Sequence, residues 1–98
     1  TGQVKEYHTQ LTDVVREYID RRFEVSSVEQ TSDETLRAMR GLLSDKKELY
    51  ESLREMLTLA DLVKFAKWTA TPDENEKSLR SAYTFVKETT PVNEPTEN

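Results

Sequence analysis

The sequence predicts an all-α protein, a compact bundle of four to five helices around a central apolar helix. Apolar residues recur at steps of three and four along most of the chain. There are only two glycines, and all three prolines lie after residue 70, so the first part of the chain lacks the turn residues that closely spaced strands require. The stretch from Leu59 to Trp68 is apolar on nearly every side in a chain that is 34% charged, which is typical of a buried central helix.

The first helix is predicted to run from about Val4 to Phe23, with charged side chains on the face opposite its apolar stripe. Residues 24–30 combine β-branched and serine residues without helical periodicity. We therefore expect an extended link there, which places Val25 and Val28 on the core. The stripe of the first helix follows steps of three and four through Val4, Tyr7, Leu11, Val14, Val15, Tyr18 and Arg22, widened by Ile19.

A second helix is expected to begin at Thr31, because Glu34 follows three residues later and the two form a capping-box pattern. We expect Gly41 with Ser44 to end this helix. Asp45 is then expected in the first turn of the third helix, where the helix dipole favours an anion. The apolar side of the second helix is formed by Leu36, Met39, Leu42 and Leu43.

The third predicted helix carries the longest apolar stripe, which Leu59, Leu62 and Phe65 widen until little polar surface remains. Thr58 with Asp61 could cap a fresh turn, so one helix bent near Thr58 and two consecutive helices are both compatible with the pattern. The stripe itself consists of Leu49, Leu53, Met56, Leu57, Ala60, Val63 and Ala66.

The last helix is predicted to begin at Pro72, with Thr71 as its N-cap and Glu74 three residues after the cap. It is expected to stop near Thr89 and Thr90, ahead of Pro91. We expect residues 1–90 to form a single helical domain and residues 91–98 a disordered tail. The predicted apolar side of this helix follows Leu79, Ala82, Tyr83 and Val86, with Phe85 beside them.

Composition excludes several classes of function. With 14 basic against 19 acidic residues and a net charge of -5, the chain is a poor ligand for nucleic acid. It has no cysteine, which excludes a disulfide scaffold, a thiolate zinc site and a cysteine nucleophile. No apolar run is long enough to cross a bilayer, and the N-terminus lacks the features of a signal peptide. We expect the chain as given to be soluble, and its start at Thr1 allows it to be a piece of a longer protein.

No residue pattern indicates catalysis, a cofactor or a metal, so we predict that the chain is not an enzyme. His8 is the only histidine and is interpreted as structural or solvent-exposed. The acidic pairs Asp33-Glu34 and Asp73-Glu74 are explained by helix first turns. Two glycines cannot form a glycine-rich phosphate loop. A hydrolytic triad would have to rest on His8, because no other base accompanies Ser26, Ser27 and Ser32.

The partner-binding candidates are Lys64, Lys67 and Trp68, where two cations alternate with two aromatic residues, Phe65 included. Tryptophan and phenylalanine beside cations are typical of protein interfaces. The alternative is that Phe65 and Trp68 complete the core while both lysines extend their charged ends into water.

From Tyr7 to Pro91 the chain resembles the cytosolic C-terminal domain of bacterial membrane-anchored proteins of the Bat (Bacteroides aerotolerance) type. The strings TSDE and ADLVKFAK are the most specific features of this resemblance. The segments that carry it are Tyr7-His8, Val15-Arg16-Glu17-Tyr18, Arg22-Phe23-Glu24-Val25, Glu29-Gln30-Thr31-Ser32-Asp33-Glu34, Leu59-Ala60-Asp61-Leu62-Val63-Lys64-Phe65-Ala66-Lys67, Glu74-Asn75-Glu76 and Ala82-Tyr83-Thr84-Phe85-Val86.

The resemblance implies a place in the cell rather than a reaction. In such proteins an extracytoplasmic β-sandwich part and one transmembrane helix come before this domain, and the genes lie beside a MoxR-type AAA+ ATPase and von Willebrand A-domain proteins. It implies that the anchor lies in a preceding portion and that the domain works on the cytoplasmic side of the bacterial inner membrane. The family provides no catalytic motif.

We therefore expect a non-enzymatic protein-interaction module that docks a MoxR-type ATPase or a von Willebrand A-domain partner. The alternative is a winged-helix-like regulatory or DNA-associated domain, which short helices joined around Gly41 suggest and the net acidity opposes. Weak homo-oligomerisation is a further expectation, because the aromatic residues exceed what so small a core covers. The residues concerned are Phe65, Trp68, Tyr83 and Phe85.

Overall fold

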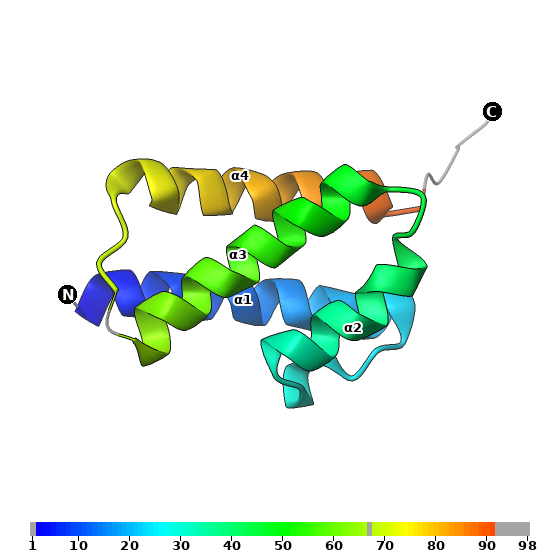
Figure 1. Cartoon of the computed structure of the whole chain (residues 1–98), viewed down its shortest axis with the longest axis horizontal. Coiled ribbons are helices and arrows are strands. Elements are labelled where there is room, and N and C mark those ends of the chain that lie inside the picture. The colour runs from blue at the N-terminus through cyan, green and yellow to red at the C-terminus, as the bar shows by residue number, and fades with distance from the viewer. Residues whose placement is uncertain (1, 67, 92–98) are drawn as a thin grey trace.

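The structure, a computed structural model, describes residues 2–66 and 68–91 and confirms the all-α prediction (Figure 1). Helix α3 contacts α1, α2 and α4, so it is the central helix of the bundle, and it runs through Thr58 without a break. Of the predicted tail, only Pro91 lies within the described residues. The elements in order are α1 (Gly2–Phe23), a short 3-10 helix η1 (Ser27–Glu29), α2 (Ser32–Leu42), α3 (Lys47–Phe65) and α4 (Pro72–Thr89).

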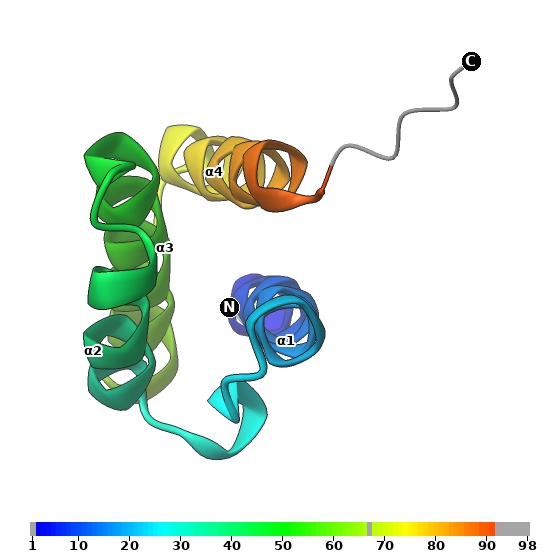
Figure 2. The same ribbon diagram turned by 90° about the vertical axis from the view of Figure 1, so that its right-hand side faces the viewer.

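The helices lie in two layers. Figure 2, which looks along the bundle, shows α2 and α3 on one side and α1 and α4 on the other. Helix α3 crosses the α1 and α4 pair diagonally, and its C-terminal end lies where α1 begins (Figure 1). Among the described residues, no helix covers the side of α1 and α4 that faces away from α3.

Helices α1 and α4 run parallel, and side-chain hydrogen bonds fix their register. At the start of both helices, the Tyr7 hydroxyl donates to the Asn75 carbonyl at 3.1 Å. Near their ends, the Tyr18 hydroxyl is hydrogen-bonded to the Thr89 hydroxyl at 2.7 Å, and Arg22 Nε donates to the Thr89 carbonyl at 2.7 Å. A residue of α1 therefore lies beside the α4 residue whose number is about 68 higher.

The large apolar side chains of the core gather toward the half of the bundle that contains α2. This cluster consists of Val15, Ile19, Leu36, Met39, Leu43, Leu53, Met56, Leu57, Ala82 and Phe85. Toward the other end, where α1 begins and α3 ends, the buried residues are smaller or polar. Less apolar surface is therefore buried on folding at this end. They are His8, Thr12, Ala60, Val63, Ala70 and Ser78.

The predicted apolar side of the last helix is rotated from the observed one. Leu79 and Tyr83 are exposed, whereas Phe85 is completely buried. Both stripes contain Ala82, so hydrophobicity alone does not choose between them. The observed side buries Phe85, and Thr89 is buried with it because its hydroxyl donates to the Phe85 carbonyl at 2.7 Å. The side of α4 that packs inward is formed by Ser78, Ala82, Phe85 and Thr89.

Three further apolar positions differ from the prediction. Val14 on α1 and Leu42 on α2 are exposed, because each lies at the edge of its stripe. In the link after α1, Val25 packs against the core as expected, but Val28 is exposed. The link is not extended. It turns through η1 because the Asp20 carboxylate accepts hydrogen bonds from the backbone N–H groups of Ser27 and Val28.

The sequence signals for helix starts succeed where a capping box is present. Thr31 and Glu34 form the complete box at the start of α2, and Thr71 and Glu74 form it at the start of α4. In each box the side chain of one residue accepts from the backbone N–H of the other, so four N–H groups that the helices leave unpaired are satisfied.

The predicted turn between the second and third helices is wrong in detail. Gly41 lies inside α2 rather than ending it, and Leu43 is the C-terminal cap. Asp45 precedes α3, which begins at Lys47 with no side-chain cap from Lys46. The Leu43 N–H already donates to the Met39 carbonyl, so this helix end is satisfied by the backbone without a glycine in a left-handed conformation.

Glu24, directly after α1, has a φ of 58°, the left-handed conformation that favours glycine. Replacing Glu24 with glycine is therefore expected to stabilise the protein by about 0.5–1 kcal/mol, because the steric strain of the side chain is removed. Urea denaturation measures this change. Glu17→Gly in the middle of the same helix serves as control and should cost about 1 kcal/mol. A loss of stability in Glu24→Gly would contradict the assignment of strain.

Candidate functional site

The candidate surface lies at the C-terminal end of α3, where the backbone folds back over the last helical turn. The N–H groups of Ala66 and Trp68 both donate to the Leu62 carbonyl at 3.0 Å. These two bonds satisfy an acceptor that the end of a helix would otherwise leave unpaired. They also fix the backbone of Trp68 against α3, so this residue is part of the folded helix end rather than of a loose linker.

Most of the apolar side chains at this helix end are exposed to solvent. The exposed fractions are 75% for Phe65, 52% for Trp68 and 40% for Leu62, whereas Val63 is buried. The expectation that Leu59 to Trp68 is surrounded by core is therefore wrong for this end. The physical reason is that α3 extends beyond the large apolar cluster, and its neighbours here are small or polar.

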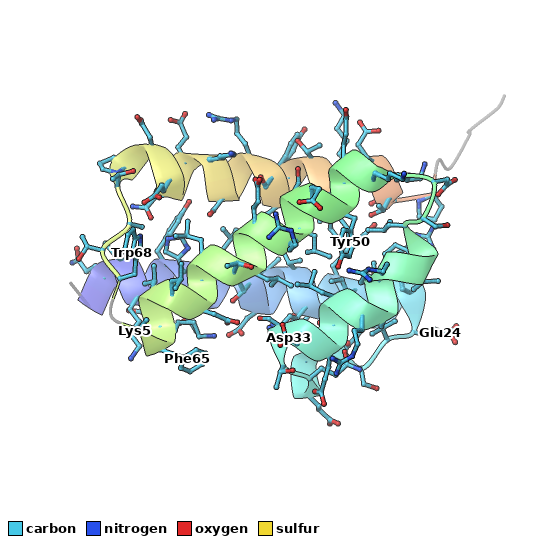
Figure 3. The ribbon with its side chains drawn as sticks, in the orientation of Figure 1. Lys5, Glu24, Asp33, Tyr50, Phe65 and Trp68 are labelled. Atoms are coloured by element: carbon cyan, nitrogen blue, oxygen red, sulfur yellow. The ribbon has the colours of Figure 1, made fainter. Side chains whose placement is uncertain are left out.

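The candidate residues lie together at one end of the molecule. Figure 3 shows Phe65, Trp68 and Lys5 at the end where α1 begins, with Trp68 on the side of α1 toward α4 and Lys5 and Phe65 on the opposite side. The Lys64 ammonium group lies 5.5 Å from the centre of the Phe65 ring, a distance at which a cation is attracted by the ring face. Lys67 lies outside the described residues. We define Leu62, Lys64, Phe65 and Trp68 as the end cluster.

The exposure of both aromatic residues bears on the two interpretations of this segment. Phe65 and Trp68 do not complete the core, which was the alternative to a surface role. Sequence patterns did not single out Leu62 or Lys5 as surface candidates. Leu62 resembles a core residue by its type, and Lys5 is brought to this end only by the antiparallel packing of α1 and α3. No local signal in the sequence would have identified either one.

His8 is completely buried and links α1 to α4. Its Nε2 donates to the Asn75 side-chain oxygen at 2.6 Å, and its Nδ1 has no hydrogen-bond partner. The ring lies edge-on to Tyr7, with 5.3 Å between ring centres. Within the part of the chain that the structure describes, no three His, Cys, Asp or Glu side chains gather as metal ligands would. The geometry gives His8 a structural role between the two helices.

Two of the three candidate serines belong to a network around Arg16. The guanidinium group donates to the carbonyls of Ser27 at 2.9 Å and Gln30 at 3.1 Å. It also donates to the hydroxyls of Ser32 at 2.9 Å and Thr35 at 3.2 Å. All four acceptors are neutral. The arrangement holds the link between α1 and α2 in place and explains why Ser27 and Ser32 are buried.

A shallow groove between α3 and α4 is one of several surface hollows that could hold a ligand. Its volume is about 180 Å³, and an ion pair between Lys77 and Glu55 crosses it at 3.5 Å. Glu74 lines the groove but is already engaged in the capping box of α4. A volume below the roughly 300 Å³ of typical ligand pockets leaves little room for a small molecule.

The structure also bears on two further expectations, the winged-helix alternative and the absence of a membrane-spanning helix. In the described ranges, 2–66 and 68–91, no β-strand is present, so these residues supply no β-hairpin wing. In the same ranges, no helix combines the length and the apolar character that a bilayer crossing demands.

Comparisons of the chain with protein-family models, with curated protein sequences and with solved structures found no match. The case for a function therefore rests on the geometry of the end cluster and on the sequence resemblance described above.

Proposed function

We propose that this chain is a non-enzymatic protein-interaction module and that the end cluster is its binding surface. The observation that carries the proposal is the exposure of both Phe65 and Trp68 at the end of the chain's most apolar segment. A partner that covers exposed apolar area of this kind removes it from water, and this burial contributes favourably to the free energy of binding. Tryptophan is also among the residues that contribute most to binding at protein interfaces.

The chemistry of the end cluster indicates the kind of partner surface that it fits. The aromatic rings would enter an apolar pocket on the partner. Lys5 lies at the same end as Phe65 (Figure 3), and the Lys64 ammonium group lies 5.5 Å from the centre of the Phe65 ring. In this otherwise acidic protein, both lysines would face carboxylates around that pocket. The backbone bonds from Ala66 and Trp68 to Leu62 hold the cluster before binding, so less conformational entropy is lost on association.

The resemblance to Bat-type proteins supports a more specific form of the proposal. In this form the chain is the cytosolic domain of a membrane-anchored protein, and the anchor belongs to a preceding portion of that protein. The domain then docks a MoxR-type AAA+ ATPase or a von Willebrand A-domain partner on the cytoplasmic side of the bacterial inner membrane. No cofactor takes part in this role.

Trp68→Ala combined with Lys64→Glu is expected to lower capture of such a partner by at least about tenfold, because interface tryptophans and charges each contribute about 1 kcal/mol or more. The measurement is a pull-down from bacterial lysate with the domain as bait, in which the captured ATPase or A-domain protein is identified by mass spectrometry. Leu42→Ser is the control, since Leu42 is an exposed apolar residue on α2, away from the end cluster. Equal capture by wild type and the double variant would refute the surface assignment.

A further inference from the structure

A second exposed apolar surface lies on the outer side of the α1 and α4 pair, away from α3. Val14 is 62% exposed, Leu79 50% and Tyr83 68%. Val14 lies four residues before Tyr18, which contacts α4, and Leu79 lies four residues after Asn75, which contacts α1. Because the two helices run parallel in this register, Val14 lies beside Ala82, at a position along the helix axis between Leu79 and Tyr83. The three exposed side chains therefore form one surface.

The outward stripe of α4 has an acidic residue at one end, an apolar middle and a basic residue at the other end. The acidic residue, Glu76, also forms an exposed ion pair with Arg80 of the same helix at 3.2 Å. Glu76, Leu79, Tyr83 and Lys87 follow one another at steps of three, four and four, so they lie on one side of the helix. All four are exposed. When a second copy of this stripe runs antiparallel to the first, its basic end lies opposite the acidic end and its acidic end opposite the basic end. The stripe is therefore complementary to itself.

We propose that this face binds a second copy of the chain. We place a two-fold axis in the plane between the two copies, perpendicular to the helices. This axis packs α1 of one copy on α1 of the other and α4 on α4, each pair antiparallel. Leu79 of each copy then meets Tyr83 of the other, because both positions are equally far from an axis near Ser81. Glu76 meets Lys87 about the same axis, and the helix register places Val14 close to that axis on α1.

The size of the face sets the expected strength of the dimer. Three exposed apolar side chains on two helices form a smaller contact than the roughly 800 Å² per partner of a stable complex. The dissociation constant is therefore expected to lie between about 10 µM and about 1 mM, so that the dimer forms where the local concentration is high. This surface does not include the end cluster, and the proposal does not depend on the proposed function.

The test is sedimentation equilibrium of the purified chain over about 10 µM to about 1 mM. The wild-type mass is expected to rise with concentration from 11.4 kDa toward twice that value. Lys87→Glu and Glu76→Lys should each weaken the dimer by roughly tenfold at low salt, because each brings two pairs of like charges together. The double variant Glu76→Lys/Lys87→Glu restores both pairs of opposite charges with their signs exchanged. Its dimer dissociation constant should therefore lie within about threefold of the wild-type value.

Tyr83→Ser should abolish self-association, and Trp68→Ala, in the end cluster, should leave it unchanged. Circular dichroism verifies that each variant stays folded. A wild type that remains monomeric at the highest concentration would overturn the proposal and leave this face to a different protein. Failure of the double variant to recover, or loss of the dimer in Trp68→Ala, would overturn it as well.

Discussion

Replacing Phe85 with alanine is expected to destabilise the folded protein by about 3–5 kcal/mol, the largest effect of any single substitution that we predict. Phe85 is completely buried in the apolar cluster. Its ring packs edge-on against Tyr18, with 5.9 Å between ring centres, and lies 6.3 Å from the ring of Phe23. Alanine would lose these contacts and leave a cavity that the surrounding helices cannot fully close.

Urea denaturation followed by circular dichroism measures this loss. A domain of this size is stable by only about 5–10 kcal/mol, so Phe85→Leu is a milder companion that keeps the protein folded. Tyr83→Ala is the matched control, because Tyr83 is a nearby aromatic residue of the same helix but exposed, and it should change the free energy of unfolding by less than about 0.5 kcal/mol. A cost for Tyr83 as large as that for Phe85 would mean that α4 is rotated from the orientation described.

Replacing Arg16 with alanine is expected to cost about 2–3 kcal/mol, the second largest effect. The guanidinium group donates to four oxygen acceptors within 3.2 Å in the link and in α2, and alanine would leave these acceptors without their charged donor. Part of the loss is recovered because water can reach the half-buried site. The link between α1 and α2 should also become more open, because no other side chain of α1 bridges the same four acceptors.

The free energy of unfolding and the hydrogen-exchange rates of the backbone amides in residues 24–31 together measure the Arg16 effect. Arg16→Lys is informative because a lysine carries one ammonium group and cannot span acceptors that the planar guanidinium reaches from two nitrogens. It should recover only a minor part of the loss. Arg21→Ala, on the exposed side of the same helix, is the control and should be nearly neutral. If Arg16→Ala and Arg21→Ala cost the same, the network contributes nothing to stability.

The parts of the fold that sequence reasoning predicted are those that local chemistry determines. The capping boxes at Thr31 and Thr71 mark the starts of α2 and α4 because their hydrogen bonds involve residues only three apart. The span of α1 follows from a long stripe at helical spacing. These signals need no knowledge of neighbouring helices, and they were sufficient for the all-α class.

The parts that were missed depend on contacts between distant residues. The rotation of α4 is set by Thr89 and Tyr18, which are far apart in the sequence. The burial of His8 requires Asn75 on another helix. The network around Arg16 includes backbone carbonyls, which have no signature in the sequence. Periodicity identifies that a helix has an apolar side but does not fix its edges to within one residue.

In the candidate site, too, the sequence reveals the local pattern but not the contacts with distant residues. The alternation of Lys64, Phe65 and Trp68 is visible in the sequence, and it drew attention to the end of α3 as a candidate surface. Whether the rings are buried or exposed depends on what lies next to them. At this end the buried residues include His8, Ala60 and Ser78 rather than leucine or phenylalanine, and both rings are exposed.

Binding of a protein partner to the end cluster is tested most directly through Trp68, because it is the only tryptophan of the chain. The chain is labelled with 5-fluorotryptophan, which gives a single fluorine NMR signal from Trp68 even when the partner contains tryptophan. Purified MoxR-type ATPase or von Willebrand A-domain protein is then added. If the end cluster is the binding surface, the Trp68 signal is expected to shift or broaden in proportion to the amount of complex formed. An unchanged signal with both partners, including in any complex that light scattering detects, would contradict it.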